Sequence, residues 1–145
     1  MATSDIINEH KQTARAFGER LLSGRFDDLR ELCTDDAVFR DPAFGPDGAD
    51  FDSMVDYFER TQEAMSDIEY EIVDMVAEGD HLFYRGRLTA THSGEFMGIA
   101  PTNRRVSVED HIEFRFEGDE IAETWAQYDA MGMMRQIGEE LPGPA

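Results

Sequence analysis

Two aspartates, an amide and an indole are expected to share the apolar face of a hairpin late in the chain. Apolar and polar residues alternate over 104–116, which indicates a half-buried strand, and Gly118-Asp119 is a typical two-residue loop before a return strand at 121–129. Residues opposite one another in a hairpin point to the same side. The loop predicts these facing pairs: Ile112 with Trp125, Asp110 with Gln127, and Val108 with Asp129. A one-residue bulge would reverse the faces.

Carboxylates on an apolar face favour acid/base chemistry. Burial of an unpaired carboxylate is costly or raises its pKa, and an aspartate with a raised pKa can remove a proton next to a carbonyl group. Asp129 is one candidate, and its position before Ala130 equally suits the cap of a short helix at 130–136. Asp110 is either a second acid, which donates a hydrogen bond to an enolate, or a buried partner of an arginine or a backbone amide.

The histidines do not have the spacing of a metal site. No two of them lie at ligand spacing on one element, and Cys33 is the only cysteine, so the sequence argues against a catalytic metal. His92 has the parity of the buried face of its strand, where it is either a hydrogen-bond donor to a substrate carbonyl or a structural residue. His111 is expected on the polar face, and His10 and His81 are expected at the surface.

The composition favours a globular domain that spans residues 1–145. The hydrophobic content is 41%, no apolar run is long enough to cross a membrane, and the first residues show no secretion signal, so a cytoplasmic protein is expected. The net charge is −19, and Lys11 is the only lysine among 13 basic residues. The acids are spread along the chain, which favours adaptation to concentrated salt over a patch for a basic partner. This charge argues against nucleic acid or an anionic membrane as a partner.

The expected elements are helices followed by hairpins. A first helix, capped by Thr3 or Ser4, ends at Gly24; further elements are a helix at 26–33, a strand at 37–41, a helix after Asp50 or Asp52, and strands at 68–78 and 81–92. Three helices must then cover one face of a mostly antiparallel sheet, which gives an α+β cone with a pocket at its open end. The apolar loop at 93–103 either packs on the core or closes a pocket or subunit contact. The tail at 141–145 is expected to fray.

Three phrases in the sequence resemble the SnoaL-like polyketide cyclase family of the NTF2-like superfamily. They are THSGEFMGIAPTNRRV, FEGDEIAETWAQYD and MMRQIG, and DDAVFRDP is a further phrase typical of the superfamily. The resemblance covers most of the chain and is strongest over 91–138. The superfamily includes cyclases, isomerases, epoxide hydrolases and non-enzymatic modules, so the resemblance predicts the fold more specifically than the reaction.

The resemblance implies a reaction without a metal or an organic cofactor. Cyclases of this family close a ring of an aromatic polyketide ester by intramolecular aldol chemistry, with one acidic residue late in the chain as general acid and base. Asp129, in WAQYD, stands at the matching position. Asn103 departs from the family pattern, because a glycine is common there, and this difference concerns loop geometry.

The expected function is therefore cofactor-free acid/base chemistry, of cyclase or isomerase type, on a small apolar carbonyl compound. Asp129 would act as the acid/base group, and Asp110, His92 and Gln127 would hold the developing oxyanion. The predicted walls of the pocket are Trp125, Tyr57, Phe96 and Met97. The alternatives are a binding module without chemistry and epoxide opening by a water held between Asp129 and Gln127. Small residues among the charges of the outer sheet face predict a homodimer through that face.

Overall fold

An apolar stripe holds helix α1 (Ser4–Leu22) against the sheet. The stripe consists of Ala14, Phe17 and Leu21, which are buried, and Gly24 follows the helix with a φ of 76° that favours glycine. The computed structural model describes residues 4–138. The predicted cap at Thr3 and the predicted fraying of 141–145 lie outside the described residues. The predicted cap at Asp50 is confirmed, since its side chain accepts a hydrogen bond from the Ser53 N–H at 2.9 Å at the start of helix α3 (Phe51–Ala64).

The short helix α2 (Phe26–Arg30) ends earlier than predicted, and strand β1 (Cys33–Arg40) begins earlier. Pairing with strand β5 (Glu120–Tyr128) explains both differences. Cys33 pairs with Ile121, and the Ile121 N–H donates to the Leu32 carbonyl at 2.8 Å. Residues that were predicted to continue the helix therefore pair with β5. Tertiary pairing overrides local propensity here.

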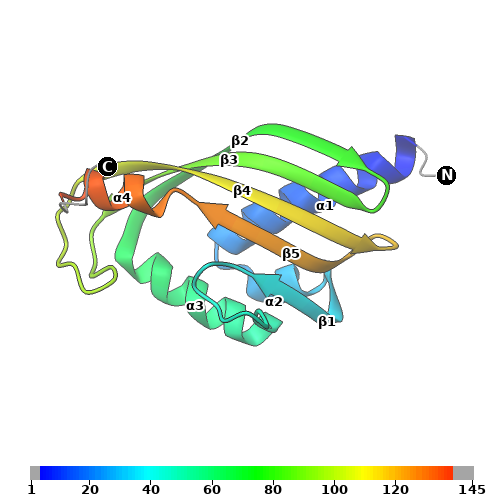
Figure 1. Cartoon of the computed structure of the whole chain (residues 1–145), viewed down its shortest axis with the longest axis horizontal. Coiled ribbons are helices and arrows are strands. Elements are labelled where there is room, and N and C mark those ends of the chain that lie inside the picture. Colours follow the sequence, from blue (N-terminus) through cyan, green and yellow to red (C-terminus); the bar gives the residue numbers. More distant parts are fainter. Residues whose placement is uncertain (1–3, 139–145) are drawn as a thin grey trace.

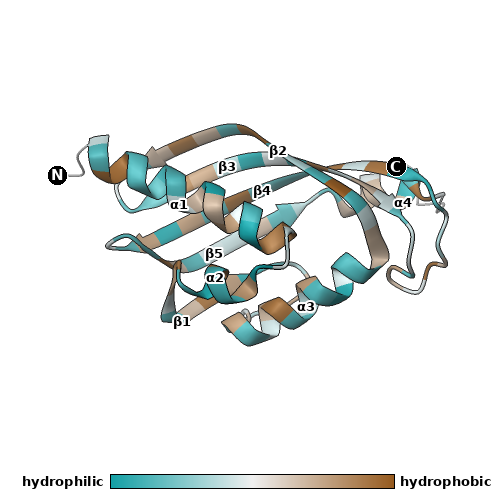
Figure 2. Cartoon of the chain, turned by 180° about the vertical axis from the view of Figure 1, so that it is seen from behind, coloured by the Kyte–Doolittle hydropathy of each residue, from teal (hydrophilic) through white to brown (hydrophobic). Residues whose placement is uncertain are grey.

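The remaining strands form two hairpins, as predicted. Strands β2 (Met65–Glu78) and β3 (His81–His92) form one, and strands β4 (Arg105–Glu117) and β5 form the other. The sheet order is β1-β5-β4-β3-β2, with β1 parallel to β5 and all other neighbours antiparallel. Helices α1, α2 and α3 lie over one face of this twisted sheet, and helix α4 (Ala130–Gln136) lies at the end opposite the hairpin tips (Figures 1 and 2). The predicted α+β fold with a curved, mostly antiparallel sheet is confirmed.

The predicted register of the last hairpin is wrong beyond its first two pairs. Glu117 faces Glu120 and Phe116 faces Ile121 as predicted, but Arg115 faces Glu123, so Ala122 is an extra residue in β5. This bulge shifts the remainder of the strand by one residue, which exchanges its two faces. The observed pairs are therefore Glu113 with Trp125, Ile112 with Ala126, His111 with Gln127, and Asp110 with Tyr128.

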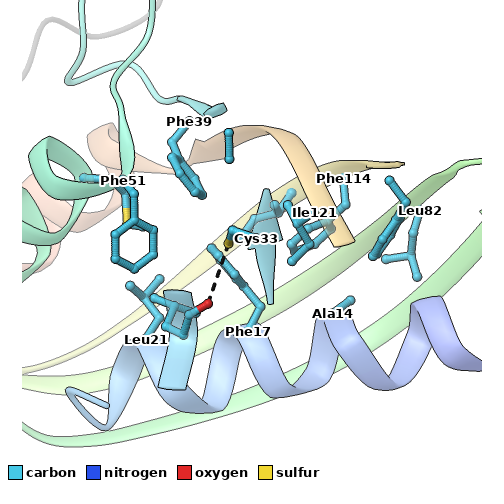
Figure 3. Packing of buried hydrophobic residues seen from close by; sticks show 14 of the residues in the cluster. Ala14, Phe17, Leu21, Cys33, Phe39, Phe51, Leu82, Phe114 and Ile121 are labelled. Carbon is cyan, nitrogen blue, oxygen red and sulfur yellow. Dashed lines mark hydrogen bonds between the residues drawn. The ribbon is translucent and has the colours of Figure 1, made fainter. Parts of the chain in front are cut away.

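The core lies between the sheet and the helices. Phe17 packs edge-on against Phe114, with ring centroids 5.4 Å apart, and Phe39 packs against Phe51 at 6.0 Å (Figure 3). Cys33 is buried in the same cluster, and its thiol lies 3.7 Å from the Leu29 carbonyl oxygen. Burial raises the pKa of this thiol to about 12. It is therefore a core residue and not a reactive nucleophile.

His10 is a buried residue, which corrects the expectation that it lies at the surface. It is only 3% exposed, its ring stacks on Phe116 with centroids 4.0 Å apart, and its Nε2 lies 2.8 Å from the Gly118 carbonyl oxygen. The residue joins α1 to the turn between β4 and β5. No helix among residues 4–138 combines the length and apolarity needed to cross a membrane.

Candidate active site

An apolar cavity of about 150 Å³ lies between the helices and the sheet, and Met133 of helix α4 is among its lining residues. Its walls come from α1, α3, α4, all four strands of the two hairpins, and the segments after β1 and β3. Most of its lining is aliphatic or aromatic, for example Leu21, Phe58, Leu88 and Ile112. A few polar side chains interrupt this lining, which is the usual composition of a small-molecule site. Two aspartates and four tyrosines among these polar residues form two sets.

The first set is a chain of hydroxyl groups that ends on Asp110. The Tyr70 hydroxyl oxygen lies 2.8 Å from Oδ1 and 3.0 Å from Oδ2 of Asp110, and the hydroxyl donates to this carboxylate. The Tyr84 side chain hydrogen-bonds with Tyr70 in turn. Strand pairing explains the meeting, since Gly86 stands opposite Asp110 and its missing side chain leaves room for the Tyr70 hydroxyl. The result is a carboxyl group supported by two tyrosines inside an apolar cavity.

The cavity makes ionisation of these groups less favourable. Burial raises the pKa of Asp110, and the hydrogen bond from Tyr70 opposes this rise in part. Burial also raises the pKa of Tyr70 and of Tyr84. Both hydroxyl groups are therefore protonated donors at neutral pH, while the pKa of the carboxyl group is moved toward the range that acid/base catalysis requires.

The second set comes from three other elements and consists of Asp41, Tyr57 and Tyr128. Asp41 follows β1, Tyr57 lies on α3, and Tyr128 ends β5 directly opposite Asp110. The hydroxyls of Tyr57 and Tyr128 hydrogen-bond with each other, and both tyrosines lie within electrostatic range of Asp41. Burial raises the pKa of Asp41, while a hydrogen bond from the Ala43 N–H lowers it in part. A second carboxyl group with a raised pKa therefore lines the same cavity.

Sequence reasoning did not identify Asp41 or Tyr128 as site residues. Tyr128 was missed because the bulge at Ala122 turns it, and not Gln127, toward the face of Asp110. The bulge falls at the apolar pair Ile121-Ala122, and such a pair does not distinguish a bulge from a regular strand. For Asp41 the available signal was an aspartate at the end of a buried strand, just before Pro42.

Several of the predicted site residues do line the cavity. Asp110, Tyr57 and Phe96 are part of its wall. Gln127 lies at its edge and also lines a neighbouring groove with Arg40 and Trp125, but its side chain is exposed. These residues approach the cavity from four different segments: β4, α3, the loop after β3, and β5.

Trp125 belongs to the opposite face of the sheet, which corrects its predicted position on the cavity side. It faces Glu113 across the hairpin and stacks on His81, with ring centroids 6.3 Å apart. Glu123 forms ion pairs on the same outer face with Arg40 at 2.7 Å and Arg115 at 3.2 Å. The hydrogen bond from Arg40 holds the pKa of Glu123 below its usual value. The one-residue bulge is the reason for the corrected position of Trp125.

The loop after β3 places its two predicted wall residues differently. Phe96 and Ile99 exchange two backbone hydrogen bonds, of 3.0 and 2.8 Å, around a Met97-Gly98 turn. Phe96 lines the cavity, whereas Met97 is 69% exposed at the tip and lines only an outer groove. The N–H groups of Ser93 and Gly94 donate to the Ala64 carbonyl, at 3.1 and 3.0 Å, and attach the base of the loop to the end of α3.

His92 is fully buried at the base of this loop. Its Nδ1 accepts a hydrogen bond from the Thr102 N–H at 3.3 Å and lies 2.9 Å from the Thr102 hydroxyl, while its Nε2 is buried without a hydrogen-bond partner among residues 4–138. It is not part of the cavity lining. Its predicted contact with a substrate oxyanion stays a prediction.

Asp129 caps helix α4. Its Oδ1 accepts a hydrogen bond from the Gly132 N–H at 2.9 Å, and the residue is exposed and outside the cavity lining. This geometry confirms the capping interpretation of Asp129. Its role as an acid/base group stays a prediction that turnover measurements must test.

An outer groove of about 480 Å³ adjoins the cavity. The two spaces share Tyr57, Thr61, Phe96 and Tyr128 as wall residues. The groove adds Arg60, Glu95 and Met97, so it is more polar than the inner space. Within residues 4–138, no three His, Cys, Asp or Glu side chains are placed to hold a metal ion.

Known structures share this architecture. IdmH from Streptomyces antibioticus, a proposed polyketide cyclase, is 31% identical, with 90% of this chain and 99% of IdmH covered and a TM-score of 0.80. AclR from Streptomyces galilaeus, a proposed hydroxylase, is 24% identical over 96% of this chain and 86% of its own, with a TM-score of 0.75. A SnoaL-like polyketide cyclase candidate from Jannaschia sp. CCS1 is 20% identical over 97% and 99% of the two chains, with a TM-score of 0.84. The last two likenesses concern the fold alone.

The sequence itself matches one family. No curated protein matches it significantly. The family model of the SnoaL-like polyketide cyclases matches residues 11–137. The matched segment includes most of the chain and every residue that lines the cavity. Together with the identity to IdmH, this match shows that the chain belongs to the SnoaL-like polyketide cyclase family.

Proposed function

We propose that this protein is a cyclase or isomerase that performs acid/base chemistry without a cofactor on a small, apolar carbonyl compound. One observation carries this proposal: the Asp110 carboxyl group lies in an apolar cavity with its two oxygens 2.8 and 3.0 Å from the Tyr70 hydroxyl. Membership of a polyketide cyclase family and the likeness to IdmH support the same class of reaction.

The polar groups of the cavity suit the formation of an enolate. Removal of a proton next to a carbonyl group moves negative charge to the carbonyl oxygen, and donors already in place lower the energy of that charge without reorganisation. The protonated form of Asp110 supplies such a donor, and the Tyr70 hydroxyl holds this carboxyl group in place. Burial of Asp110 raises its pKa, so this carboxyl group can be protonated when the oxygen carries its charge.

The dimensions of the site limit the reacting part of the substrate. A cavity on the order of 150 Å³ accommodates about one ring, and the apolar lining favours a hydrocarbon ring over a sugar or a nucleotide. A larger substrate would extend into the outer groove past Phe96. A ring ketone is therefore a suitable first probe, and 1-tetralone combines an aromatic ring with exchangeable protons next to its carbonyl group.

Deuterium uptake by 1-tetralone in D₂O, followed by mass spectrometry, tests the proposal. We expect the wild type to accelerate exchange over buffer and over a denatured sample, and Asp110→Asn to lower the rate by about 10²-fold or more, the usual contribution of such a group. Asp36→Asn is the matched control, because Asp36 is exposed on the outside of β1 and undergoes the same chemical change. Binding of tetralone without any acceleration would instead support a binding module.

A further inference from the structure

We propose that Asp41 is the base of this site and removes the carbon-bound proton, while Asp110, held in place by Tyr70, donates a hydrogen bond to the carbonyl oxygen. The inference rests on the proposed function and assigns separate tasks to the two carboxyl groups of one cavity. Asp41 and Asp110 both line that cavity, and they reach it from different strands, the end of β1 and the middle of β4. The Tyr57–Tyr128 hydroxyl pair belongs to the Asp41 side.

The two carboxyl groups differ in the partners of their oxygens. Both oxygens of Asp110 lie within hydrogen-bond distance of the Tyr70 hydroxyl. Asp41 accepts one hydrogen bond at Oδ1, from the Ala43 N–H at 2.9 Å, and its Oδ2 has no donor among residues 4–138. Arg40, the neighbouring cation, is occupied by Glu123 and by the Pro46 carbonyl. Asp41 therefore keeps an oxygen free to accept a proton from a substrate.

The two carboxyl groups also differ in their access to water. Asp41 lines a second groove on the far side of the cavity wall, with Pro42 and Phe44, whereas Asp110 does not reach that groove. Contact with solvent favours the charged form of a carboxyl group, and two like charges in one cavity disfavour double ionisation. A single negative charge in the site is thus best placed on Asp41, which leaves Asp110 as the protonated partner. This is the arrangement in which two carboxyl groups divide the roles of base and acid.

The proton balance of a ring closure fits this division. The Asp41 carboxylate takes the proton from the carbon next to the carbonyl group, the C–H bond breaks, and the electron pair forms the enolate. The enolate oxygen accepts a hydrogen bond from protonated Asp110, whose other oxygen accepts the hydroxyl proton of Tyr70. The enolate carbon then bonds to a second carbonyl carbon of the same molecule. The oxygen of that second carbonyl group takes the proton back from Asp41, directly or through the Tyr57–Tyr128 pair. No proton is gained or lost, and no oxidant or reductant is needed.

Asp41 also has a structural task, and one variant separates the two tasks. Its hydrogen bond to Ala43 holds the turn after β1, and an asparagine at this position keeps a side-chain oxygen for the same bond. Asp41→Asn therefore preserves the turn but removes the base. Asp41→Ala removes both, so that the difference between the two variants in urea unfolding reports the turn alone.

Two measurements on the full-length protein test the assignment: deuterium uptake by 1-tetralone, and the affinity of 2-naphthol, whose phenolic oxygen imitates an enolate oxygen beside aromatic rings. We expect Asp41→Asn to lower the exchange rate by about 10²-fold or more and to leave the naphthol Kd within a factor of about three. We expect Asp110→Asn and Tyr70→Phe to weaken naphthol binding by about tenfold, because the first replaces the donor that meets the oxygen and the second removes the hydroxyl that positions this donor. Asp36→Asn serves as the control in both measurements.

The possible failures have different signatures. If the wild type accelerates exchange and folded Asp41→Asn exchanges at the wild-type rate, Asp41 is a turn residue only and the inference is overturned while the proposed function stands. Weakened naphthol binding in Asp41→Asn, with wild-type binding in Asp110→Asn, would reverse the assigned sides and likewise overturn it. If the wild type itself produces no acceleration, the proposed function fails, and the base assignment fails with it.

Discussion

Tyr70 and Asp110 meet across the bare backbone of Gly86. A Cβ atom at Gly86 would lie 2.0 Å from the Tyr70 hydroxyl oxygen and 2.5 Å from Asp110 Oδ1, closer than atoms can approach. The glycine does not serve a special backbone angle here, because its φ is not positive. Its function is to leave the volume in which a tyrosine from β2 reaches a carboxylate on β4.

Gly86→Ala is therefore expected to separate the two groups. Either Tyr70 or Asp110 must leave its position, so we expect at least a tenfold loss of exchange activity and a loss of about 1–3 kcal/mol in the free energy of unfolding, as for other overpacked sites. Gly45→Ala is the control, since nothing lies within 4 Å of its added methyl group. Unchanged activity in Gly86→Ala would show that the Tyr70–Asp110 contact is dispensable.

Asp110→Asn is expected to change how stability depends on pH. Burial raises the pKa of Asp110 in the folded protein, so its contribution to stability is fully present below the unfolded pKa of about 3.9 and is lost as the pH rises through the folded pKa. The variant lacks this loss. Urea unfolding of wild type and variant at pH 4 and pH 7 should show a difference that moves in favour of the variant at the higher pH.

Many carboxyl groups of this acidic chain titrate over the same range, so a single comparison is not enough. Asp36→Asn, measured under the same conditions, corrects for the general removal of one negative charge. If the free energies of unfolding of the two variants changed with pH in the same way, burial would not raise the pKa of Asp110.

Phe96→Ala and Met97→Ala are expected to differ, although the residues are neighbours. Phe96 lines the cavity and Met97 is exposed at the tip of the loop. Removal of a half-buried phenyl ring from a binding wall costs about 1–2 kcal/mol, or roughly tenfold in Kd. Naphthol titrations by calorimetry should show this weakening for Phe96→Ala and a nearly unchanged Kd for Met97→Ala. Equal effects of the two substitutions would argue against Phe96 as a wall residue.

Asp129 offers a direct comparison between a helix cap and a catalytic acid. Asp129→Ala should lower the free energy of unfolding by about 1 kcal/mol, while Asp129→Asn should remain close to the wild type, because asparagine is an equally good cap. We expect Asp129→Asn to retain exchange activity, since the residue lies outside the cavity lining. A loss of about 10²-fold in the folded variant would restore Asp129 as the acid/base group.

The predicted homodimer through the outer sheet face also has a specific test. Val76 and Phe83 face each other on that side and are exposed in the single chain. We expect the protein to sediment as a dimer in molar salt, where the Debye length is about 3 Å and charge repulsion is screened, and Phe83→Glu to lower its mass to that of a monomer. Met131→Glu, which changes an exposed methionine on α4, should remain dimeric.

The order and limits of most elements could be predicted because the signals are local. Alternation along β4, the Gly118-Asp119 loop and the cap at Asp50 each depend on a few adjacent residues. The candidate site could be predicted only in part. Asp110 was identified because it interrupts an apolar alternation, but its partner Tyr70 lies 40 residues away and meets it only through the strand order of the sheet.

The faces of β5 could not be predicted because they depend on one extra residue. An apolar pair such as Ile121-Ala122 fits a regular strand and a bulge equally well. The observed register brings together residues that are distant in the sequence: Glu123 with Arg40, and Tyr128 with Tyr57. The regular register therefore places Trp125 on the cavity side and Tyr128 on the outer side, the reverse of what the structure shows. Asp110 was placed correctly, because it lies on β4, which has no bulge.

The bulge at Ala122 decides which residues of β5 face the cavity. Deletion of this one residue would restore the regular register and turn Trp125 and Gln127 inward in place of Ala126 and Tyr128. A cavity wall of alanine and tyrosine would become one of tryptophan and glutamine through the loss of a single codon. One deletion thus changes several wall residues at once. A relative with the same fold could change its substrate preference by a single insertion or deletion, whereas the same change by point substitutions would take several steps.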